Sequence, residues 1–414
     1  MNQQRTLFLL FLLIALAAIW LTLPLASNFK YSNGKELLAW FIPLPVALLY
    51  FIVNVYLRKH AVQTAWLAML LFLLLWIPFI PDLTDTYQYY EQDDGSRYRL
   101  VATNLVKNQT LNAGDGVIFG TQDKVYMIQP GYRYYLGLWI RMFGRETRLY
   151  QVVNMLVYLA AVLLFFVKSA KVSLPSVFRS GTLAFVFLSS PFVVKLIMMG
   201  LTEWLAASIF LAAVSLYWSR RLVPAMILLA LLPFIRQNLL IVSLLVTCWM
   251  IMKEKQKVLL TIVFLGILLL PLYHNLYYAG RWQFFSVYDD PSTFMAWEFG
   301  GSYNTRFFKN LLYHISLYSG INYRLENLFA NVLSLASIPL GTYLVIRACF
   351  YLQRRNRAWY LLIISAAIVP TLFLGGTAYY PRFEWVNISI GIISFVLIKS
   401  GEESKGANRP LKLN

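Results

Sequence analysis

The sequence predicts an all-α polytopic membrane protein, a bundle of about twelve transmembrane helices with interfacial helices in its outer loops. Composition is the first reason. The chain has 414 residues, of which 59% are hydrophobic and 13% charged, whereas soluble proteins average roughly 25% charged residues. Length is the second reason, because many apolar runs reach the roughly 17–25 residues that cross a bilayer core. Charge is the third, because basic residues gather in short connections between these runs.

The apolar runs give the order of the expected spans. Hydropathy places them at residues 7–25, 37–57, 64–80, 151–167, 182–199, 203–218, 222–235, 238–252, 258–275, 327–346, 358–378 and 384–398. The first run is long and further spans follow it, so we expect it to be retained rather than removed as a signal peptide. The runs at 222–235 and 238–252 are short and meet at Arg236, which predicts a tight hairpin.

Charge sets the expected orientation. One family of connections is short and basic, including Arg58-Lys59, Arg220-Arg221 and residues 354–357, and the other is long and rich in acids. Basic connections stay in the cytoplasm, so we expect both termini to be cytoplasmic and the long segments to face outward, as in a bacterial inner membrane. Topology then explains most of the net charge of +18, and no nucleic acid partner is needed.

This orientation divides the chain into five parts. They are residues 1–80 with the first spans, 81–150 as a first outer loop with interfacial helices and the active-site acid, 151–275 as a central transmembrane module, 276–326 as a second outer loop, and 327–414 with the last spans and a short cytoplasmic tail. The active face is therefore expected on the outer, periplasmic side.

Residue types that build metal and nucleotide sites are scarce. Cys248 and Cys349 fall in apolar helical sequence, which argues against a disulfide framework or a cysteine metal site. The chain has three histidines, too few to favour a histidine-built zinc site. It has no phosphate-binding glycine loop of the nucleotide type. We therefore expect no required cofactor, and an activated substrate that is membrane-borne or arrives from outside.

The first outer segment contains Asp93-Asp94-Gly95-Ser96, which leads into an amphipathic helix. Acids at a helix N-terminus stabilise the helix dipole and cap free N–H groups, so capping is one reading of Asp94. The other reading is a general base that acts on a sugar hydroxyl just above the membrane. Asp93 and Asp85 are further candidates for this acid, although Asp85 also fits a simple marker of the helix exit.

A second stretch, residues 129–144, carries aromatic and basic side chains. Pro130-Gly131 predicts a turn, and Tyr132 falls on one face of the helix that follows. Arg133 stands beside the turn, and arginine suits phosphate because its planar fork binds two oxygens. The alternative is an interfacial helix with snorkelling arginines, which fits Arg141 and Arg145.

Three charged residues are expected at the outer ends of later spans. Glu203 opens the span at 203–218, and a carboxylate beside a membrane span is functional by default; the alternative is that Thr202 or Glu203 caps the helix. Arg236 is at the outer tip of the hairpin, and Arg382 is at the outer mouth of the last span. An outer cavity with carboxylates and arginines would suit a phosphate-bearing, lipid-linked substrate.

Four stretches together resemble the GT-C glycosyltransferases, the polyprenyl-phosphate-sugar-dependent membrane enzymes that include protein O-mannosyltransferases and the lipid A aminoarabinose transferase. They are DGSRYRLVATNL from Asp94, QPGYRYYLGLWIRMFG from Gln129, LTEWLAASIFL from Leu201 and YYPRFEWVNISIG from Tyr379. Asp94, Arg97, Tyr98 and Ala102 fit the first of the family's motifs. The resemblance covers about residues 81–253, with the last match near Arg382.

The resemblance implies a GT-C-like bundle and an inverting sugar transfer from a polyprenyl-phosphate donor to a hydroxyl of a lipid, glycan or protein acceptor. It implies Asp94 as the base or acceptor-orienting acid and Glu203 as a second acid. It also implies the remaining roles: Arg133, Arg236, Arg382 and Arg97 at the donor phosphate, and Tyr98 and Tyr132 in the substrate pocket. A divalent metal can bridge phosphate and Asp94, but the chemistry does not require one.

Two other functions fit the same composition. An O-antigen-type polymerase or ligase would also use polyprenyl-linked glycans, but would rely on late outer arginines such as Arg281, Arg306 and Arg324. A transporter or flippase for lipid-linked sugars would place ionisable residues deep inside spans, where Lys195 is the best candidate besides Glu203.

Overall fold

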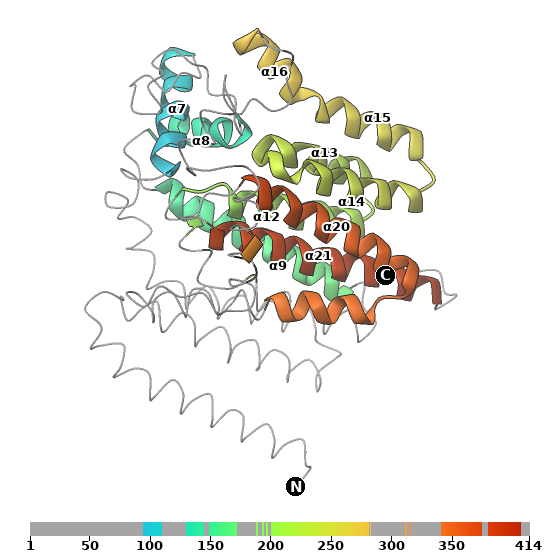
Figure 1. Cartoon of the computed structure of the whole chain (residues 1–414). Coiled ribbons are helices and arrows are strands. Elements are labelled where there is room, and N and C mark those ends of the chain that lie inside the picture. The colour runs from blue at the N-terminus through green and yellow to red at the C-terminus, as the bar shows by residue number, and fades with distance from the viewer. Residues whose placement is uncertain are drawn as a thin grey trace, which may run out of the picture.

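The structure, a computed structural model, is all-helical, with no strand among the residues it describes. These residues are 94–109, 130–144, 149–171, 188, 193, 196–197, 200–280, 282, 311–312, 315, 341–374 and 380–406. The helices run side by side as a bundle, and α7 and α8 lie together at one end (Figure 1). The helical class predicted from the sequence is confirmed for this part of the chain.

Three helical segments are long and apolar enough to cross a membrane. The first, Tyr150–Ser169, lies in α9 (Leu149–Lys171); the second, Lys257–Tyr278, covers α15 (Lys257–Leu268) and α16 (Leu270–Ala279); the third, Arg382–Glu402, lies in α21 (Tyr380–Gly406). All three coincide with predicted spans. The predicted spans before residue 94 lie outside the described residues, as does most of the span at 182–199.

Shorter apolar helices fill the centre of the bundle. They are α12 (Glu203–Trp218), α13 (Leu222–Ile235), and the pair η3 (Gln237–Leu239) and α14 (Leu240–Lys253). Their bounds match the predicted spans at 203–218, 222–235 and 238–252 within one residue. The tight hairpin predicted at Arg236 is confirmed, because this single residue separates α13 from η3.

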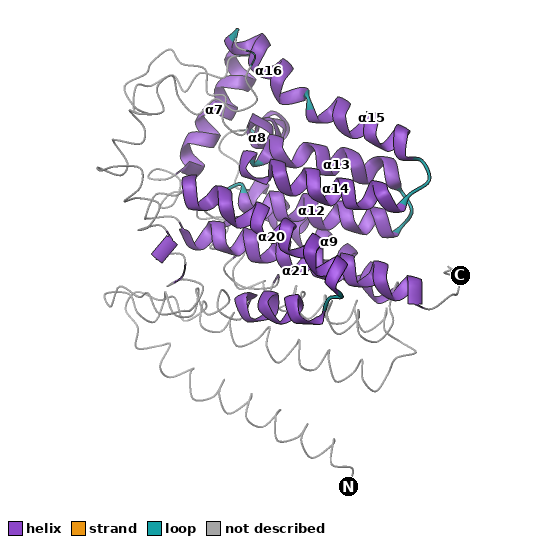
Figure 2. Cartoon of the chain, turned by 45° about the vertical axis from the view of Figure 1, so that its right-hand side comes forward, coloured by secondary structure: helices purple, strands orange, loops and turns teal. Residues whose placement is uncertain are grey.

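The core forms around α12, which is apolar on all sides, as expected for a fully surrounded helix. It packs against α9, α13 and α21. Trp204, Phe210 and Val214 on α12 are completely buried. Helix α20 (Arg354–Leu374) packs on α21 and α14 and closes the other side of the bundle (Figure 2).

Polar contacts at one end of the bundle agree with the sidedness expected from charge. Arg220, in the turn between α12 and α13, forms a 2.9 Å ion pair with Glu254, in the turn between α14 and α15. Trp218 Nε1 donates to Ser400 Oγ at 3.1 Å, which brings the end of α21 to the same place. Two of the basic connections assigned to the cytoplasmic side, at 220–221 and 253–257, therefore share one end of the bundle with the end of α21.

At the opposite end, α7 (Asp94–Asn108) and α8 (Pro130–Phe143) pack on each other. The turn predicted at Pro130-Gly131 is wrong, because both residues belong to the first turn of α8. Proline is well suited to that position, since its missing N–H has no intrahelical partner there. Gly144, with φ of +83°, follows the last residue of α8 and permits the left-handed conformation that ends a helix.

The span predicted as one helix at 258–275 is broken. α15 ends at Leu268 and α16 begins at Leu270, with Pro271 in its first turn. Proline removes a backbone donor and disfavours a continuous helix before it. Helix α16 lies at the end of the bundle where α7 and α8 lie (Figure 1), and its His274 ring lies near the rings of Tyr134 in α8 and Phe234 in α13.

Candidate functional site

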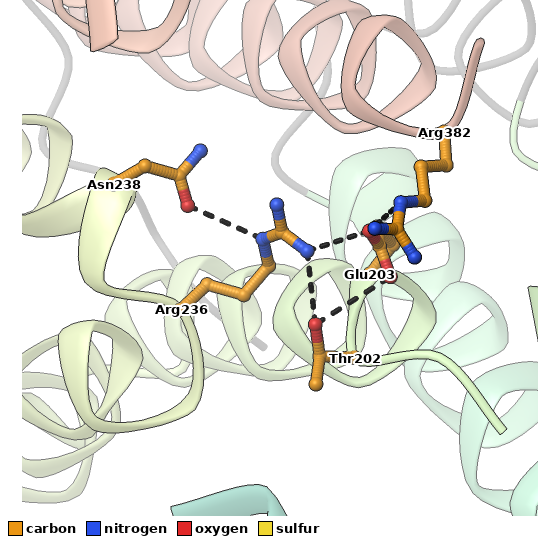
Figure 3. A network of polar contacts seen from close by, with 5 residues as sticks. All are labelled: Thr202, Glu203, Arg236, Asn238 and Arg382. Atoms are coloured by element: carbon orange, nitrogen blue, oxygen red, sulfur yellow. Dashed lines mark hydrogen bonds and ion pairs between the residues drawn. The ribbon is translucent and has the colours of Figure 1, made fainter. Parts of the chain in front are cut away.

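A buried ion-pair network joins the residues that the sequence placed at three separate span ends (Figure 3). Arg236 Nη1 donates to Glu203 Oε1 at 2.6 Å, and Arg382 Nε lies 3.3 Å from the same oxygen. The side chains of Glu203, Arg236 and Arg382 are 0%, 4% and 11% exposed. One carboxylate thus holds two guanidinium groups in nearly complete isolation from solvent. We call these three residues the arginine network.

Two neutral side chains hold Arg236 in place. Its Nη1 also donates to Thr202 Oγ1 at 2.9 Å, and its Nε donates to Asn238 Oδ1 at 3.2 Å. Its third nitrogen, Nη2, has no dashed line in Figure 3 and makes no hydrogen bond to any described residue. Three hydrogen-bond partners therefore fix the guanidinium plane, and Nη2 stays available.

The ring of Phe383 is shared by both cations. The guanidinium carbons of Arg236 and Arg382 each lie 4.9 Å from the centroid of this ring. Aromatic faces attract cations electrostatically, more strongly when water is excluded. Phe383 therefore helps to hold two like charges close to one carboxylate.

Local sequence explains how each residue reaches the network. Glu203 is the first residue of α12, so its side chain projects from the start of an apolar helix. Arg236 has extended backbone (φ −141°, ψ 107°) between α13 and η3, just after Pro233 weakens the last turn of α13. The capping alternative for Thr202 is wrong: it forms no side-chain cap bond to α12, and its hydroxyl binds Arg236 instead.

A second cluster joins α7 to α8. Arg133 is fully buried, and its guanidinium carbon lies 5.0 Å from the ring centroid of Tyr98. Tyr98 also meets Tyr132 edge to face, with ring centroids 5.4 Å apart. Three residues predicted for the site, Arg133, Tyr98 and Tyr132, therefore pack together inside the α7–α8 pair.

Helix α8 connects this cluster to the arginine network. Tyr134 stacks on Phe234, two residues before Arg236, with ring centroids 6.1 Å apart. Tyr135 contacts Trp204, the neighbour of Glu203, at 5.8 Å, and its hydroxyl donates to Asn154 Oδ1 on α9 at 2.7 Å. The α7–α8 pair is thus seated on the ends of α9, α12 and α13 beside the arginine network.

The tyrosines of α8 are neutral hydroxyl groups at physiological pH. Burial raises the pKa of Tyr132 well above its ordinary value, and the nearby Tyr150 hydroxyl adds to this shift. Burial also raises the pKa of Tyr135. Desolvation disfavours the charged phenolate, so these side chains can act as hydrogen-bonding groups but not as phenolate bases.

Several predicted residues fall outside what the structure describes. The helix predicted after residues 93–96 is present, but α7 begins earlier, at Asp94, and the side chains of Asp94 and Arg97 are outside the described set. The further candidates outside it are Asp85, Asp93, Lys195, Arg281, Arg306 and Arg324. In the described part of the chain no three metal-ligating side chains gather.

Sequence reasoning missed three contributors to the arginine network. Asn238 and Phe383 stand within two residues of Arg236 and Arg382, so their proximity along the chain was a usable signal. Thr202 was considered only as a cap. Its hydroxyl accepts a hydrogen bond from Arg236 and donates one to Glu203. The bond to Arg236 depends on the packing of α12 against the α13–η3 turn, which the sequence does not show.

Comparison of the chain with protein-family models, with curated proteins and with solved structures finds no match.

Proposed function

We propose that this chain is an integral membrane glycosyltransferase. It moves a sugar from a polyprenyl-phosphate donor to a hydroxyl of a lipid, glycan or protein acceptor on the outer face of the membrane, with inversion. The observation that carries the proposal is the arginine network: two guanidinium groups, both nine-tenths buried or close to it, share one carboxylate at the end of an apolar bundle.

The chemistry of arginine supports a phosphate as the ligand of this network. The guanidinium fork matches two phosphate oxygens and keeps its charge when buried. Glu203 and Asn238 hold the guanidinium of Arg236 through Nη1 and Nε. Nη2 can therefore donate to a ligand without rotation of the guanidinium plane. Donors set in place before the reaction stabilise the charge that grows on a departing phosphate.

The surroundings of the network support a lipid-linked ligand. Glu203 begins a helix that is otherwise apolar except for two serines, and Arg382 begins a segment long and apolar enough to span a membrane. A polyprenyl chain can lie along such helices while its phosphate stays at their polar ends. Holding donor and acceptor in one membrane layer also supplies part of the rate acceleration through proximity.

The proposal gives Glu203 a positioning role. The sequence suggested it as a second catalytic acid, but a carboxylate 2.6 Å from one arginine and 3.3 Å from another is best used to aim those cations. The oxygen that faces the site is already in contact with both cations, which supports a role in orienting them.

Asp94 remains the proposed base. It would take the proton of the acceptor hydroxyl while that oxygen attacks the anomeric carbon and the bond to the phosphate oxygen breaks. Support comes from the packing of its element: α7 is fastened to α8 through Tyr98, and α8 meets α13 at Phe234, close to Arg236. Among the described residues no three metal-ligating side chains gather. A chelator added to the transfer reaction tests whether a divalent ion takes part.

The test uses the purified full-length chain with a polyprenyl phosphate and a polyprenyl-phosphate sugar. Arg236→Gln is expected to weaken polyprenyl phosphate binding by about 10-fold or more, because a charged hydrogen bond is lost. Asp94→Asn should bind the lipid normally but transfer sugar about 10²–10⁴-fold more slowly. Arg220→Gln, at the opposite end of the bundle, is the matched control and should change neither.

Two results would overturn the proposal. Failure of the unmutated chain to bind polyprenyl phosphate would reject this class of donor. Sugar transfer at the full rate by Asp94→Asn would reject Asp94 as the base. Loss of transfer on Arg306→Gln with Asp94→Asn unaffected would favour an O-antigen-type polymerase or ligase instead.

A further inference from the structure

Helix α16 has two different faces. Tyr273 and Tyr277, four residues apart, are 57% and 83% exposed, whereas His274 is 9% exposed and Asn275 is buried. Residues four apart share one helix face, so His274 and Tyr278 point together toward α8 and α13. His274 therefore lies on the face of α16 that meets the α8 and α13 helices.

The hydrogen bonding of His274 leaves one ring nitrogen as an unused acceptor. Nδ1 lies 3.1 Å from Asn275 Oδ1. That oxygen can only accept, so Nδ1 carries the hydrogen, and in a neutral imidazole the lone pair is then on Nε2. Nε2 is buried and has no hydrogen-bond partner among the residues that the structure describes. A buried acceptor without a partner is costly, which points to a ligand that supplies a donor.

Three aromatic rings lie near the imidazole of His274. The centroids of Tyr134, Phe234 and Tyr278 lie 5.5, 5.8 and 4.9 Å from that of His274. All three rings are only partly buried, so their outer faces are accessible. The hydroxyl groups of Tyr134 and Tyr278 also lie close enough to interact. We call these four residues the His274 site.

The composition of the His274 site matches a carbohydrate. A sugar ring presents apolar C–H faces that pack on aromatic rings and hydroxyl groups that both donate and accept hydrogen bonds. The site offers aromatic surface, two tyrosine hydroxyls and one empty acceptor. None of its four residues carries a carboxylate, and the guanidinium of Arg133 on α8 is close enough to act on His274, which disfavours a basic ligand.

The His274 site also adjoins the arginine network. Phe234 belongs to the site and stands two residues before Arg236. Tyr134 belongs to α8, whose Gly131 approaches Phe234 so closely that an added Cβ would lie 2.9 Å from the Phe234 carbonyl oxygen. A sugar at the His274 site would therefore be near a phosphate held by Arg236.

We propose that the His274 site is a carbohydrate subsite in which His274 Nε2 accepts a hydrogen bond from a sugar hydroxyl and the rings of Tyr134, Phe234 and Tyr278 pack on the sugar. The proposal rests on the proposed function only in taking the sugar to be part of a substrate. His274 binds and orients here; no proton transfer is assigned to it.

Saturation-transfer difference NMR on the full-length chain in lipid nanodiscs tests this directly. The probes are free mannose, glucose, galactose and N-acetylglucosamine. At least one should receive saturation from the unmutated protein. His274→Phe, which keeps an aromatic ring but removes the acceptor, should weaken its binding by about threefold or more. Tyr134→Phe, a milder change, should also weaken it, and keeps the test valid if His274→Phe does not fold.

Tyr277→Phe is the matched control, because it removes a hydroxyl from the exposed face of the same helix and should leave sugar binding unchanged. Absence of saturation transfer to all four sugars, or equal binding by the unmutated chain and both site variants, would overturn the proposal.

Polyprenyl phosphate binding on the same variants separates this inference from the proposed function. His274→Phe should bind polyprenyl phosphate as the unmutated chain does. Sugar binding that depends on His274 in a chain that does not bind polyprenyl phosphate would keep the subsite and reject the glycosyltransferase. The reverse result would keep the donor site and reject the subsite.

Discussion

Glu203 shows how much one residue can organise when it is buried with its partners. Its carboxylate would be strongly disfavoured in an apolar interior on its own, and it is tolerated because Arg236 and Arg382 supply compensating charge. The same reasoning applies in reverse to the arginines. Removing the carboxylate takes away the negative charge that both cations share while each stays 4.9 Å from the centroid of the Phe383 ring, so this position should be much less tolerant than a surface ion pair.

Glu203→Gln is therefore expected to destabilise the protein by about 3 kcal/mol or more, in the range measured when one partner of a buried ion pair is removed. Thermal unfolding of the purified chain, followed by circular dichroism in detergent, measures this as a lower Tm.

Glu254→Gln is the matched control at the other end of the bundle. Its partner Arg220 is 64% exposed, and exposed pairs contribute about 0–1 kcal/mol. Equal losses of Tm in the two variants would show that the burial of the arginine network does not determine its strength.

At the scale of elements, the packing of α8 on α13 sets the distance between the arginine network and the cluster of Tyr98, Tyr132 and Arg133. Gly131 makes this close approach possible, because a side chain there would meet both the ring and the carbonyl oxygen of Phe234. A glycine within a helix ordinarily costs stability relative to alanine. Here the loss of helix stability is offset by the close contact between α8, which carries Arg133, and α13, which ends just before Arg236.

Gly131→Ala should separate α8 from α13, since the backbone oxygen of Phe234 cannot rotate away as a side chain can. We expect a loss of about 1–3 kcal/mol, typical of overpacking, together with weaker sugar binding at the His274 site, which both helices build. Tm and saturation-transfer NMR measure the two effects.

The comparison variant is Gly266→Ala in α15, where an added Cβ has open space around it. It should raise stability by up to about 1 kcal/mol through helix propensity alone. A similar response from both glycines would argue that α8 does not rest on α13.

At the scale of the whole molecule, polar contacts sort to the two ends of the bundle. The arginine network lies where α12 and α21 begin, and the Arg220–Glu254 pair lies where α12 and α14 end. The flanks of α15 between these ends carry exposed apolar side chains such as Val258 and Ile262. This distribution is typical of a bundle whose flank faces lipid and whose ends face water.

Cysteine labelling tests the expected orientation. In a chain with Cys248→Ala and Cys349→Ala, Arg141→Cys reports on the last turn of α8 and Lys255→Cys on the α14–α15 turn; both positions are exposed. A membrane-impermeant maleimide applied to intact cells should label the first and not the second, because the basic connections stay inside. Both should react after the cells are opened, and the opposite pattern in intact cells would reverse the orientation.

The amino-acid sequence by itself determined the helical class and the bounds of the central helices. A lipid-facing or lipid-adjacent helix must be continuously apolar over a length set by the bilayer, so 203–218 and 222–235 could be delimited from composition alone. It also singled out Glu203, Arg236 and Arg382, since charges at such positions are costly and rare. The break between α15 and α16 was missed because Pro271 does not lower the apolar character of its run.

Only the tertiary structure decided what those charged residues do. Arg382 is far along the chain from Glu203 and Arg236, and no local pattern states that one carboxylate oxygen serves both cations. The change of Glu203 from proposed acid to positioning residue follows from that meeting. The role of His274 also depends on long-range packing, because its aromatic neighbours come from α8, α13 and α16. Periodicity fixes which face a residue occupies, whereas the packing of distant helices fixes which groups share that face.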